Sequence, residues 1–266
     1  MRVRWTVTSL ILDLKGDMAG QQKRVALVTG AASGIGAAIA TRLHADGLDI
    51  LAVDLRPAPD GPGTAFRADL TTREGNRAAV DAALEQFGRL DVVVANAGFQ
   101  HVSPIDDFPE DRWDALLAIL LTSPFLLAKY AWPALVDSGA GRFLAIASAH
   151  ALVASPFKAG YVSAKHGVLG LVKTLALEGA AVGVTATALC PAYVRTPLVE
   201  KQISAQAVAH HLPEERVLEE VILAPQAVKR LVEPDEVAAM AAFLVGQYGG
   251  SITGVAIPMD QGWTAR

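Results

Sequence analysis

The stretch R-V-A-L-V-T-G-A-A-S-G-I-G, which runs from Arg24 to Gly36, decides the fold of this chain. Its first half, Arg24 to Thr29, is a short β-branched apolar run that predicts a buried strand. Three glycines follow, and the residues from Ala37 to about Ala45 then show the apolar periodicity of a helix. Glycines allow a backbone to approach a pyrophosphate, and a helix N-terminus offers free N–H groups and the positive end of its dipole. The order of strand, glycine turn and helix therefore favours a phosphate-binding turn over an ordinary βα connection.

The alternation of strands and helices continues to the end of the chain. Further apolar runs predict strands over 49–53, 64–68, 90–95, 142–147, 184–189 and 255–258. Helical patterns occupy 74–87, 110–136, 161–178 and 234–245, and we expect Pro124 and Pro133 to kink or divide the second of them. Seven strands alternating with helices predict an α/β fold, a single Rossmann-type domain with a doubly wound parallel sheet and helices on both faces.

The length and composition fit one large domain, which we place at 21–266. Apolar residues make up 52% of the 266 residues and charged residues 19%, so we expect a substantial buried core. The formal net charge is −4 and Lys and Arg do not cluster, which argues against a nucleic-acid partner. The single cysteine, Cys190, excludes an internal disulfide and a cysteine-rich zinc site. We expect no metal, and a reducing cytoplasm is the natural location.

Residues 1–20 differ in pattern from the rest of the chain. Two arginines and a short apolar segment are faintly similar to a signal peptide, but Asp13 and Asp17 interrupt the segment, which is too short to cross a bilayer. We therefore expect a disordered extension and no association with a membrane. A true start at Met18, just before the first strand, is the alternative.

The second predicted strand ends at Asp54, eighteen residues after Gly36. A carboxylate at this place can accept hydrogen bonds from the adenosine ribose hydroxyls and repels a 2′-phosphate, which favours NAD over NADP. Arg56 weakens this inference, because a guanidinium near the ribose could hold a phosphate.

Three proton-handling groups gather in the stretch from Ser148 to Lys165. Ser148 follows an apolar run, Tyr161 comes thirteen positions later, and Lys165 comes four positions after that. Residues i and i+4 of a helix share a face. A phenol titrates near pH ~10, and a cation one turn away stabilises its anion, so this pair suits an acid or base. A lone Y-x-x-x-K pattern is more often an exposed helix face, and the interpretation depends on the rest of the chain.

A polar, helical-looking segment runs from about 197 to 230, directly after the strand at 184–189. It interrupts the βα alternation where the chain has just left the ligand edge of the sheet. We expect a helical substrate lid there.

Four motifs together resemble the short-chain dehydrogenase/reductase family over about residues 23–266. They are T-G-A-A-S-G-I-G (Thr29 to Gly36), N-A-G (Asn96 to Gly98), Ser148 and Y-V-S-A-K (Tyr161 to Lys165). The resemblance implies that Tyr161 is the general acid/base, that Ser148 orients the substrate oxygen, and that Lys165 holds the nicotinamide ribose and lowers the pKa of Tyr161. Hydride would pass between NAD and the substrate carbon. The residues expected to bind NAD are Gly30, Ser33, Gly34, Ile35, Gly36, Asp54, Asp69, Leu70, Asn96, Ala97, Gly98, Tyr161, Lys165, Pro191, Val194 and Thr196.

Within that family, four stretches are similar to the D-3-hydroxybutyrate dehydrogenase branch, namely Asn96 to Ile105, Ala147 to Lys158, Thr196 to Ile203 and the terminal G-W-T-A. This similarity implies a homotetramer that interconverts (R)-3-hydroxybutyrate and acetoacetate. A small β-hydroxy acid carries an anion close to its reacting carbon, so a cation and amide donors beside the tyrosine suit it. The residues expected to bind the substrate are Gln100, Ser148, His150, Lys158, Tyr161, Tyr193, Gln202 and Trp263.

Some of these residues have simpler alternative roles. His150 could cap a turn, Lys158 could be a solvated loop residue, and Gln202 could be an exposed helix position.

The chain departs from the family pattern at three positions. Leu120 stands where most members have an asparagine whose surroundings bind a water that links the lysine to solvent. Either water still reaches Lys165 and the enzyme is slower or works at higher pH, which we favour, or activity is largely lost. Ala192 replaces a glycine and costs of order 1 kcal/mol if the backbone there needs φ > 0. Tyr193 replaces a tryptophan, which would leave a slightly larger or more polar pocket.

Two other functions are compatible with the sequence. The same fold could act on another small hydroxy acid or on a sugar alcohol. The chain could also be a nucleotide-binding protein whose catalysis was weakened by Leu120.

Overall fold

The structure, a computed structural model, describes residues 23–265 and shows one parallel sheet of seven strands in the order β3-β2-β1-β4-β5-β6-β7. The strand order reverses at β1, with β2 and β3 on one side of it and the other strands on the opposite side. Ligands of open α/β sheets bind at such a reversal, beyond the carboxyl ends of the strands. The doubly wound sheet expected from the sequence is confirmed. The strands are β1 (Val25–Thr29), β2 (Asp49–Asp54), β3 (Thr64–Arg67), β4 (Val92–Ala95), β5 (Arg142–Ile146), β6 (Thr185–Pro191) and β7 (Ala256–Met259).

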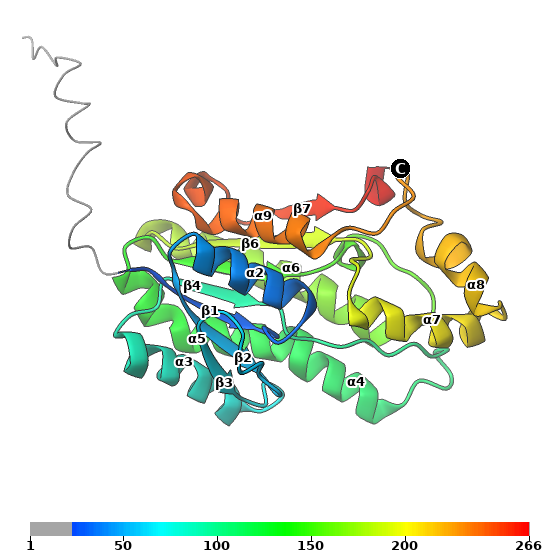
Figure 1. The fold of residues 1–266 in the computed structure, drawn as a ribbon, viewed down its shortest axis with the longest axis horizontal. Helices are drawn as coiled ribbons and strands as arrows, with labels where there is room; N and C mark the ends of the chain where they lie inside the picture. Colours follow the sequence, from blue (N-terminus) through cyan, green and yellow to red (C-terminus); the bar gives the residue numbers. More distant parts are fainter. Residues whose placement is uncertain (1–22, 266) are drawn as a thin grey trace, which may run out of the picture.

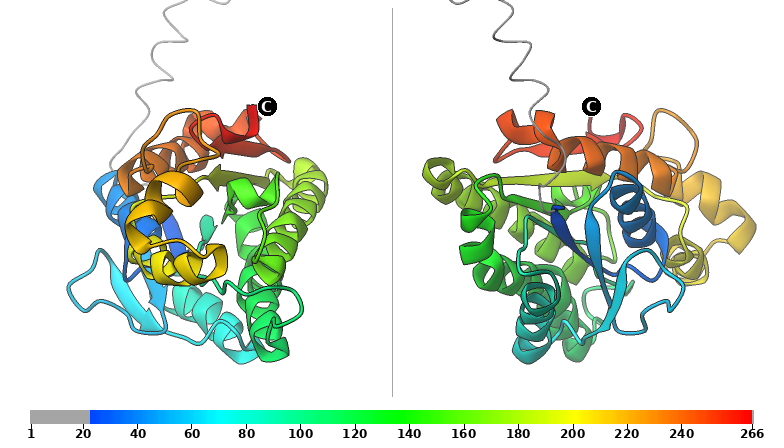
Figure 2. Two further views of the ribbon diagram at one scale, coloured as in Figure 1. Left: turned by 90° about the vertical axis from the view of Figure 1, so that its right-hand side faces the viewer. Right: turned by 60° about the vertical axis from the view of Figure 1, so that its left-hand side comes forward.

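Helices cover both faces of the sheet (Figure 1). Figure 2 shows α2 and α9 on one face and α3 to α6 on the other, and two separate groups of buried apolar side chains fill the spaces between. The helices are α2 (Gly34–Ala45), α3 (Arg73–Phe87), α4 (Glu110–Leu117), α5 (Ser123–Asp137), α6 (Ala159–Gly179), α7 (Pro197–His210), α8 (Glu214–Val217) and α9 (Pro234–Val245). Shorter segments are π-helical, η1 (Ala118–Thr122) and η4 (Leu218–Ile222), or 3₁₀-helical, η2 (Ala149–Ala151), η3 (Ala180–Val182), η5 (Gln247–Ser251) and η6 (Trp263–Ala265).

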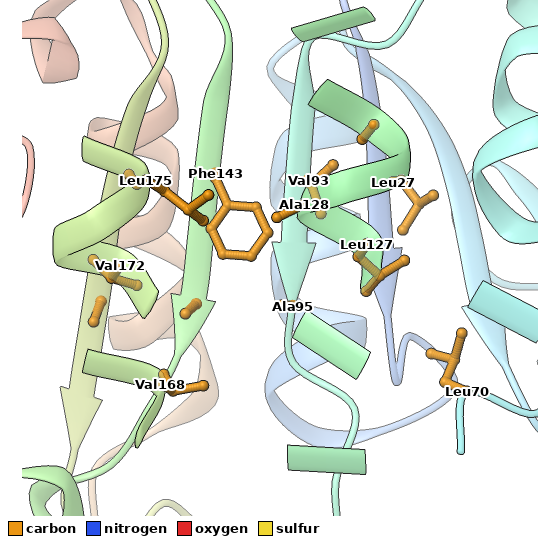
Figure 3. Packing of buried hydrophobic residues seen from close by; sticks show 14 of the residues in the cluster. Leu27, Leu70, Val93, Ala95, Leu127, Ala128, Phe143, Val168, Val172 and Leu175 are labelled. Carbon is orange, nitrogen blue, oxygen red and sulfur yellow. The ribbon is translucent and has the colours of Figure 1, made fainter. Parts of the chain in front are cut away.

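The larger core lies between the sheet and the helices α3 to α6. Phe143 of β5 points into it and is surrounded by side chains of α6, such as Leu175, and of α5, such as Ala128 (Figure 3). A buried phenyl ring of this kind costs about 3–5 kcal/mol of stability when it is truncated to Ala. This packing fixes β5, which leads into the serine of the predicted trio, against α6, which carries the tyrosine and the lysine.

The apolar region at 110–136 forms α4, η1 and α5 in succession. The expected division at Pro124 is confirmed, because Pro124 lies in the first turn of α5, just after η1. The helix is not divided at Pro133, because α5 continues through it, and a kink there stays a prediction. Pro133 lies on the exposed face of α5, where water can bind the carbonyl that loses its partner.

The same region, Glu110–Asp137, is the one helical stretch within 23–265 that is long and apolar enough to span a membrane. Half of its apolar window is buried inside the fold, and it packs against α3 and α6. It is a core helix of this fold.

The chain after β6 forms α7, α8 and η4 at the end of the sheet to which the strands point (Figures 1 and 2). These elements have a small apolar core of their own, which includes Val199, Val217 and Ile222. The helical structure ends at Ile222, so the expected helical segment to about 230 is too long, and turns fill the remainder. The expected extension at 1–20 and the alternative start at Met18 lie outside the described residues.

Candidate active site

The glycine turn after β1 is shaped for a phosphate. Gly30 and Gly34 have φ of 66° and 55°, which favour glycine. A Cβ on Gly36 would collide with the carbonyl of Gly30 and the side chain of Asn96. Ser33 precedes α2 without capping it by its side chain, and the first turn contains no acidic residue. The N–H groups at the start of α2 are therefore available to an anionic group, and the residues fit the pyrophosphate of a dinucleotide.

A cleft of about 520 Å³ runs from this turn along the carboxyl ends of the strands. None of its lining residues, all within the described part of the chain, is Lys, Arg or His. Sequence-predicted cofactor residues that line it are Gly30, Ser33, Gly34, Ile35, Asp54, Asp69, Leu70, Asn96, Ala97, Gly98 and Thr196. Gly36 lies behind the turn and supports it.

Asp54 ends β2 at the edge of this cleft. One carboxylate oxygen accepts a hydrogen bond of 3.2 Å from the backbone N–H of Ala32, and the other accepts one of 3.0 Å from that of Arg56. The carboxylate is thereby fixed beside the glycine turn. Arg56, whose guanidinium could have held a 2′-phosphate and so weakened the preference for NAD, does not line the cleft.

Asn96 joins the end of β4 to the glycine turn. Its side-chain amide donates a hydrogen bond of 2.8 Å to the carbonyl of Thr29. The Thr29 hydroxyl accepts hydrogen bonds from the backbone N–H groups of Asn96 and Ala97, at 2.9 and 3.0 Å. Thr29 was not predicted as a site residue, although it holds both turns together.

A smaller pocket of about 110 Å³ continues from the cleft. It shares Asn96, Gly98 and Thr196 with the cleft, so the two form one continuous site. All of the sequence-predicted catalytic and substrate residues meet here, together with the remaining cofactor residues. They are Gln100, Ser148, His150, Lys158, Tyr161, Lys165, Pro191, Tyr193, Val194, Gln202 and Trp263.

The trio is assembled from β5 and α6. Ser148 follows β5 in extended backbone and begins η2, while Tyr161 and Lys165 lie in the first two turns of α6, which begins at Ala159. The Lys165 ammonium donates a hydrogen bond of 2.7 Å to the carbonyl of Ile146. Ile146 is thus a second functional group that the sequence did not reveal, because a main-chain carbonyl carries no signal in the side-chain pattern.

Burial controls the electrostatics of the trio. It raises the pKa of the Tyr161 phenol, and a hydrogen bond with Ser148 partly offsets this effect. Burial also lowers the pKa of Lys165 to about 8. The expected lowering of the Tyr161 pKa by Lys165 stays a prediction. In this structure the Lys165 ammonium is engaged by the Ile146 carbonyl and lies 5.5 Å from the centre of the tyrosine ring.

Lys158 and Tyr193 form one wall of the pocket. Lys158 is only 2% exposed, and its ammonium donates a hydrogen bond of 2.7 Å to the Tyr193 hydroxyl. Burial lowers the pKa of Lys158 to about 8. The Tyr193 ring is stacked on Trp263, with centroids 5.8 Å apart. Lys158 is therefore no solvated loop residue.

His150 is buried between the trio and this wall. Its Nδ1 lies 3.4 Å from the Ser148 hydroxyl and its Nε2 lies 3.0 Å from the hydroxyl of Ser155. Burial, with a smaller contribution from Lys158, lowers the pKa of the imidazole to about 3, so His150 is neutral. Ser155 was missed from the sequence because only the folding of the 148–158 loop brings it to the ring.

The two glutamines line the pocket from different elements, since Gln100 follows β4 and Gln202 lies on α7. The Gln100 side-chain oxygen accepts a hydrogen bond of 3.0 Å from the backbone N–H of His101, which leaves its amide NH₂ free to face a ligand. The Gln202 amide donates to the carbonyl of Leu198 at 3.2 Å, and the side chain is buried.

Two of the three departures from the family pattern can be judged directly. Leu120 belongs to η1, is buried, lines the pocket and packs against Gly98. Ala192 is not among the non-glycine residues with positive φ, so the anticipated strain is absent. Its backbone N–H donates to the carbonyl of Met259.

Comparisons with known proteins agree with this geometry. A family model described as enoyl-(acyl carrier protein) reductase matches residues 30–264. The D-beta-hydroxybutyrate dehydrogenase of Rhizobium meliloti (strain 1021) is 43% identical over 256 residues, which cover 91% of this chain and 99% of that protein. The protein of the same name from Cupriavidus necator is 41% identical over 254 residues, with 91% and 98% covered. The solved structure of ligand-free aldohexose dehydrogenase from Thermoplasma acidophilum is 28% identical, with a TM-score of 0.85, and the match covers 92% of this chain and 95% of that one.

Proposed function

The chain belongs to the short-chain dehydrogenase/reductase family and is an oxidoreductase, and from this premise we propose that it interconverts (R)-3-hydroxybutyrate and acetoacetate with NAD. Its cofactor is a nicotinamide dinucleotide and its substrate is a small molecule.

The main support for this proposal is the positive charge of the smaller pocket. Lys158 and Lys165 both line it, and none of its lining residues, each within 23–265, is Asp or Glu. A buried ammonium without a carboxylate partner is costly, so it calls for an anionic ligand. The Gln100 amide lines the same pocket and is a second donor for such a carboxylate. The pocket of about 110 Å³ suits an acid of few carbons.

The trio then acts on the hydroxyl at the other end of such an acid. Ser148 and Tyr161 share a hydrogen bond, so a substrate oxygen between them can be held by one and deprotonated by the other. When bound, the oxidised nicotinamide supplies the acceptor for the hydride that leaves the alcohol carbon. The stacked Tyr193 and Trp263 rings exclude water from the apolar side of the substrate.

The residues that line the cleft favour NAD over NADP as the cofactor. Asp54 is fixed at its edge, and no cation lines it that could bind a 2′-phosphate. Backbone N–H groups at the start of α2 and the positive end of its dipole are offered to the pyrophosphate.

The segment formed by α7, α8 and η4 supports our proposal of a substrate lid. Leu198, Val199 and Gln202 of α7 line the smaller pocket, so movement of α7 would open or cover it.

We also propose a homotetramer in the cytoplasm. Exposed apolar side chains on α5 and α6, Phe125 and Leu177, support burial between subunits. Cys190, the single cysteine, is buried as a free thiol, which suits a reducing location.

A sugar alcohol is the second candidate substrate. The solved aldohexose dehydrogenase shares the fold, and Gln100, His150 and Gln202 could each bind a hydroxyl. This candidate leaves the buried charge of Lys158 without a counter-ion.

A substrate panel tests the proposal. NADH formation would be followed with (R)- and (S)-3-hydroxybutyrate, other short hydroxy acids, neutral secondary alcohols and sugar alcohols, each with NAD and with NADP. We expect (R)-3-hydroxybutyrate with NAD to give the highest kcat/KM. A higher value with a sugar alcohol would establish the second candidate instead.

A further inference from the structure

Phe157, the residue before Lys158, has an unusual backbone conformation. Its φ is 67°, in the left-handed region that side chains with a Cβ rarely adopt, whereas glycine adopts it without strain. Among the described residues, the other non-glycine residues with positive φ are His211, at the end of α7, and Gln261, two positions before Trp263. All three stand beside parts of the substrate pocket or of the proposed lid, where strain of this kind is typically retained for function.

The backbone of Phe157 joins segments that carry the expected substrate-binding groups. Lys158 follows it directly and is the N-cap of α6. The Phe157 carbonyl accepts a hydrogen bond of 2.9 Å from the backbone N–H of Ser103, in the loop after β4 that also carries Gln100. Rotation about the N–Cα bond of Phe157 would move the preceding loop, which carries His150, relative to Lys158. The left-handed φ therefore sets the relative positions of these groups.

Packing in the protein core does not explain the phenyl ring of Phe157. The residue is half-buried and belongs to none of the three groups of buried apolar side chains found within residues 23–265. Its ring meets the ring of His210, the last residue of α7, edge-on with the centroids 5.2 Å apart. Glycine at position 157 would satisfy the backbone without strain. The contact that phenylalanine adds is the one with the proposed lid.

The ring contact lies beside a second cavity, of about 570 Å³, between the proposed lid and the wall of the smaller pocket. His210 lines this cavity from α7, and Lys158 and Tyr193 line it from the wall. Burial and, to a smaller extent, the charges of Lys158 and His211 lower the pKa of His210, so the end of α7 lies within electrostatic reach of Lys158. Because His210 borders open space on this side, its contact with Phe157 helps to hold the end of α7 in place.

We propose that Phe157 is a positioning residue for the carboxylate end of the substrate. This inference rests on the proposed oxidation of a hydroxy acid and deepens it. The left-handed backbone of Phe157 sets Lys158 relative to the loop of His150, and its ring holds the end of α7 through His210. The same helix brings Gln202 into the smaller pocket. Phe157 does not line that pocket, so it acts through these residues and not on the substrate itself.

The test uses the whole protein with the changes Phe157→Asn, Phe157→Tyr and His210→Ala and with the double variant Phe157→Asn/His210→Ala. Asparagine tolerates the left-handed region, so Phe157→Asn removes the ring and keeps the backbone conformation. Phe157→Tyr keeps the ring. Phe243→Asn, at an exposed position of α9 that lines none of the three cavities, is the matched control.

The first measurement is the KM for 3-hydroxybutyrate and for a neutral secondary alcohol. An aromatic pair changes an equilibrium constant about 2- to 10-fold, so the KM for the acid should rise by about that factor in Phe157→Asn and in His210→Ala. The double variant should show no further rise, because both single changes remove the same contact. The KM for the neutral alcohol should change little in every variant. Phe157→Tyr and Phe243→Asn should behave as the wild type.

The second measurement, tryptic cleavage of the proposed lid, needs no turnover. The exposed side chain of Arg216 in α8, the helix that follows α7, offers a cleavage site. Cleavage there should be about 2- to 10-fold faster in Phe157→Asn and His210→Ala than in the wild type, because a lid without the ring contact opens more often. Phe157→Tyr and Phe243→Asn should be cleaved at the wild-type rate.

The outcomes separate the role of Phe157 from the proposed function. An active wild type whose KM for the acid is unchanged in Phe157→Asn overturns the positioning role alone. Equal rises in KM for the acid and the neutral alcohol indicate a general structural role and also overturn it, as do single effects that multiply in the double variant. A wild type that oxidises no hydroxy acid overturns the proposed function and the role of Phe157 in holding the acid, and the cleavage rates then decide whether the ring contact holds the lid.

Discussion

The ammonium of Lys158 and the hydroxyl of Tyr193 are 2.7 Å apart in a wall that separates two cavities. The hydrogen bond holds a buried cation in one position without neutralising it. Tyrosine at 193, unlike the tryptophan expected there, supplies an oxygen acceptor for this bond. The arrangement leaves the other two ammonium protons of Lys158 free for a ligand.

Replacing Lys158 by Ala should weaken the binding of acids specifically. A hydrogen bond to a charged group contributes about 1.5–3 kcal/mol, so the KM for 3-hydroxybutyrate should rise about 10- to 100-fold. The KM for a neutral secondary alcohol should change little. Lys173→Ala, which removes an exposed lysine of α6, is the matched control. Equal increases for acid and alcohol would show that Lys158 supports the pocket only by packing.

The KM for acids should depend on pH through Lys158. Burial lowers its pKa to about 8, so the side chain is cationic below pH 8 and neutral above it. The KM for 3-hydroxybutyrate should therefore be constant at low pH and rise about tenfold for each pH unit above 8. Lys165, whose pKa is also about 8, affects acids and neutral alcohols alike. The difference between the two pH profiles thus isolates Lys158, and coincident profiles would contradict the assignment.

The change Tyr193→Phe should lower the pH at which the KM for 3-hydroxybutyrate begins to rise. It keeps the stack on Trp263 but removes the oxygen that accepts the Lys158 hydrogen bond. A buried ammonium with one partner fewer loses its proton more readily, so the rise in KM should begin below pH 8. Measurement of kcat/KM for 3-hydroxybutyrate between pH 6 and 10 checks this. A rise at the wild-type pH would show that the hydroxyl does not stabilise the charge.

The change Asp54→Asn should relax the preference for NAD. The amide oxygen still accepts one of the two backbone hydrogen bonds, from Ala32 or from Arg56, but the negative charge that repels a 2′-phosphate is removed. We expect the ratio of kcat/KM values, NAD over NADP, to fall at least tenfold. Asp60→Asn, at an exposed position that does not line the cleft, should leave the ratio unchanged. A wild-type enzyme that prefers NADP would contradict the cofactor proposal before any variant is made.

The sequence was sufficient for the sheet because the central strands are dominated by buried apolar residues. The run before Asn96 and the run before Ser148 are typical of buried strands of a parallel sheet, and the polar residue that follows each run was correctly expected at the ligand edge. The ends of the helices were predicted less accurately than the strands. The helix of Tyr161 starts two residues earlier than predicted, and α5 continues through Pro133.

Contacts made by loops and by main-chain atoms could not be predicted. The bond from Lys158 to Tyr193 joins residues 35 positions apart, and the partner of Lys165 is a backbone carbonyl. Ser155 comes to His150 only because the chain turns back between β5 and α6. The pKa of Tyr161 depends on how deeply α6 is buried, which residue spacing does not reveal.

The most direct test of the central claim compares 3-hydroxybutyrate with 2-butanol, which has a methyl group in place of the carboxylate. We predict that the wild type, with saturating NAD at pH 7, has a kcat/KM for (R)-3-hydroxybutyrate on the order of 100-fold or more above that for 2-butanol, because only the acid engages the uncompensated charge of Lys158. Equal values, or a preference for 2-butanol, would contradict the claim that this pocket was built for a small hydroxy acid.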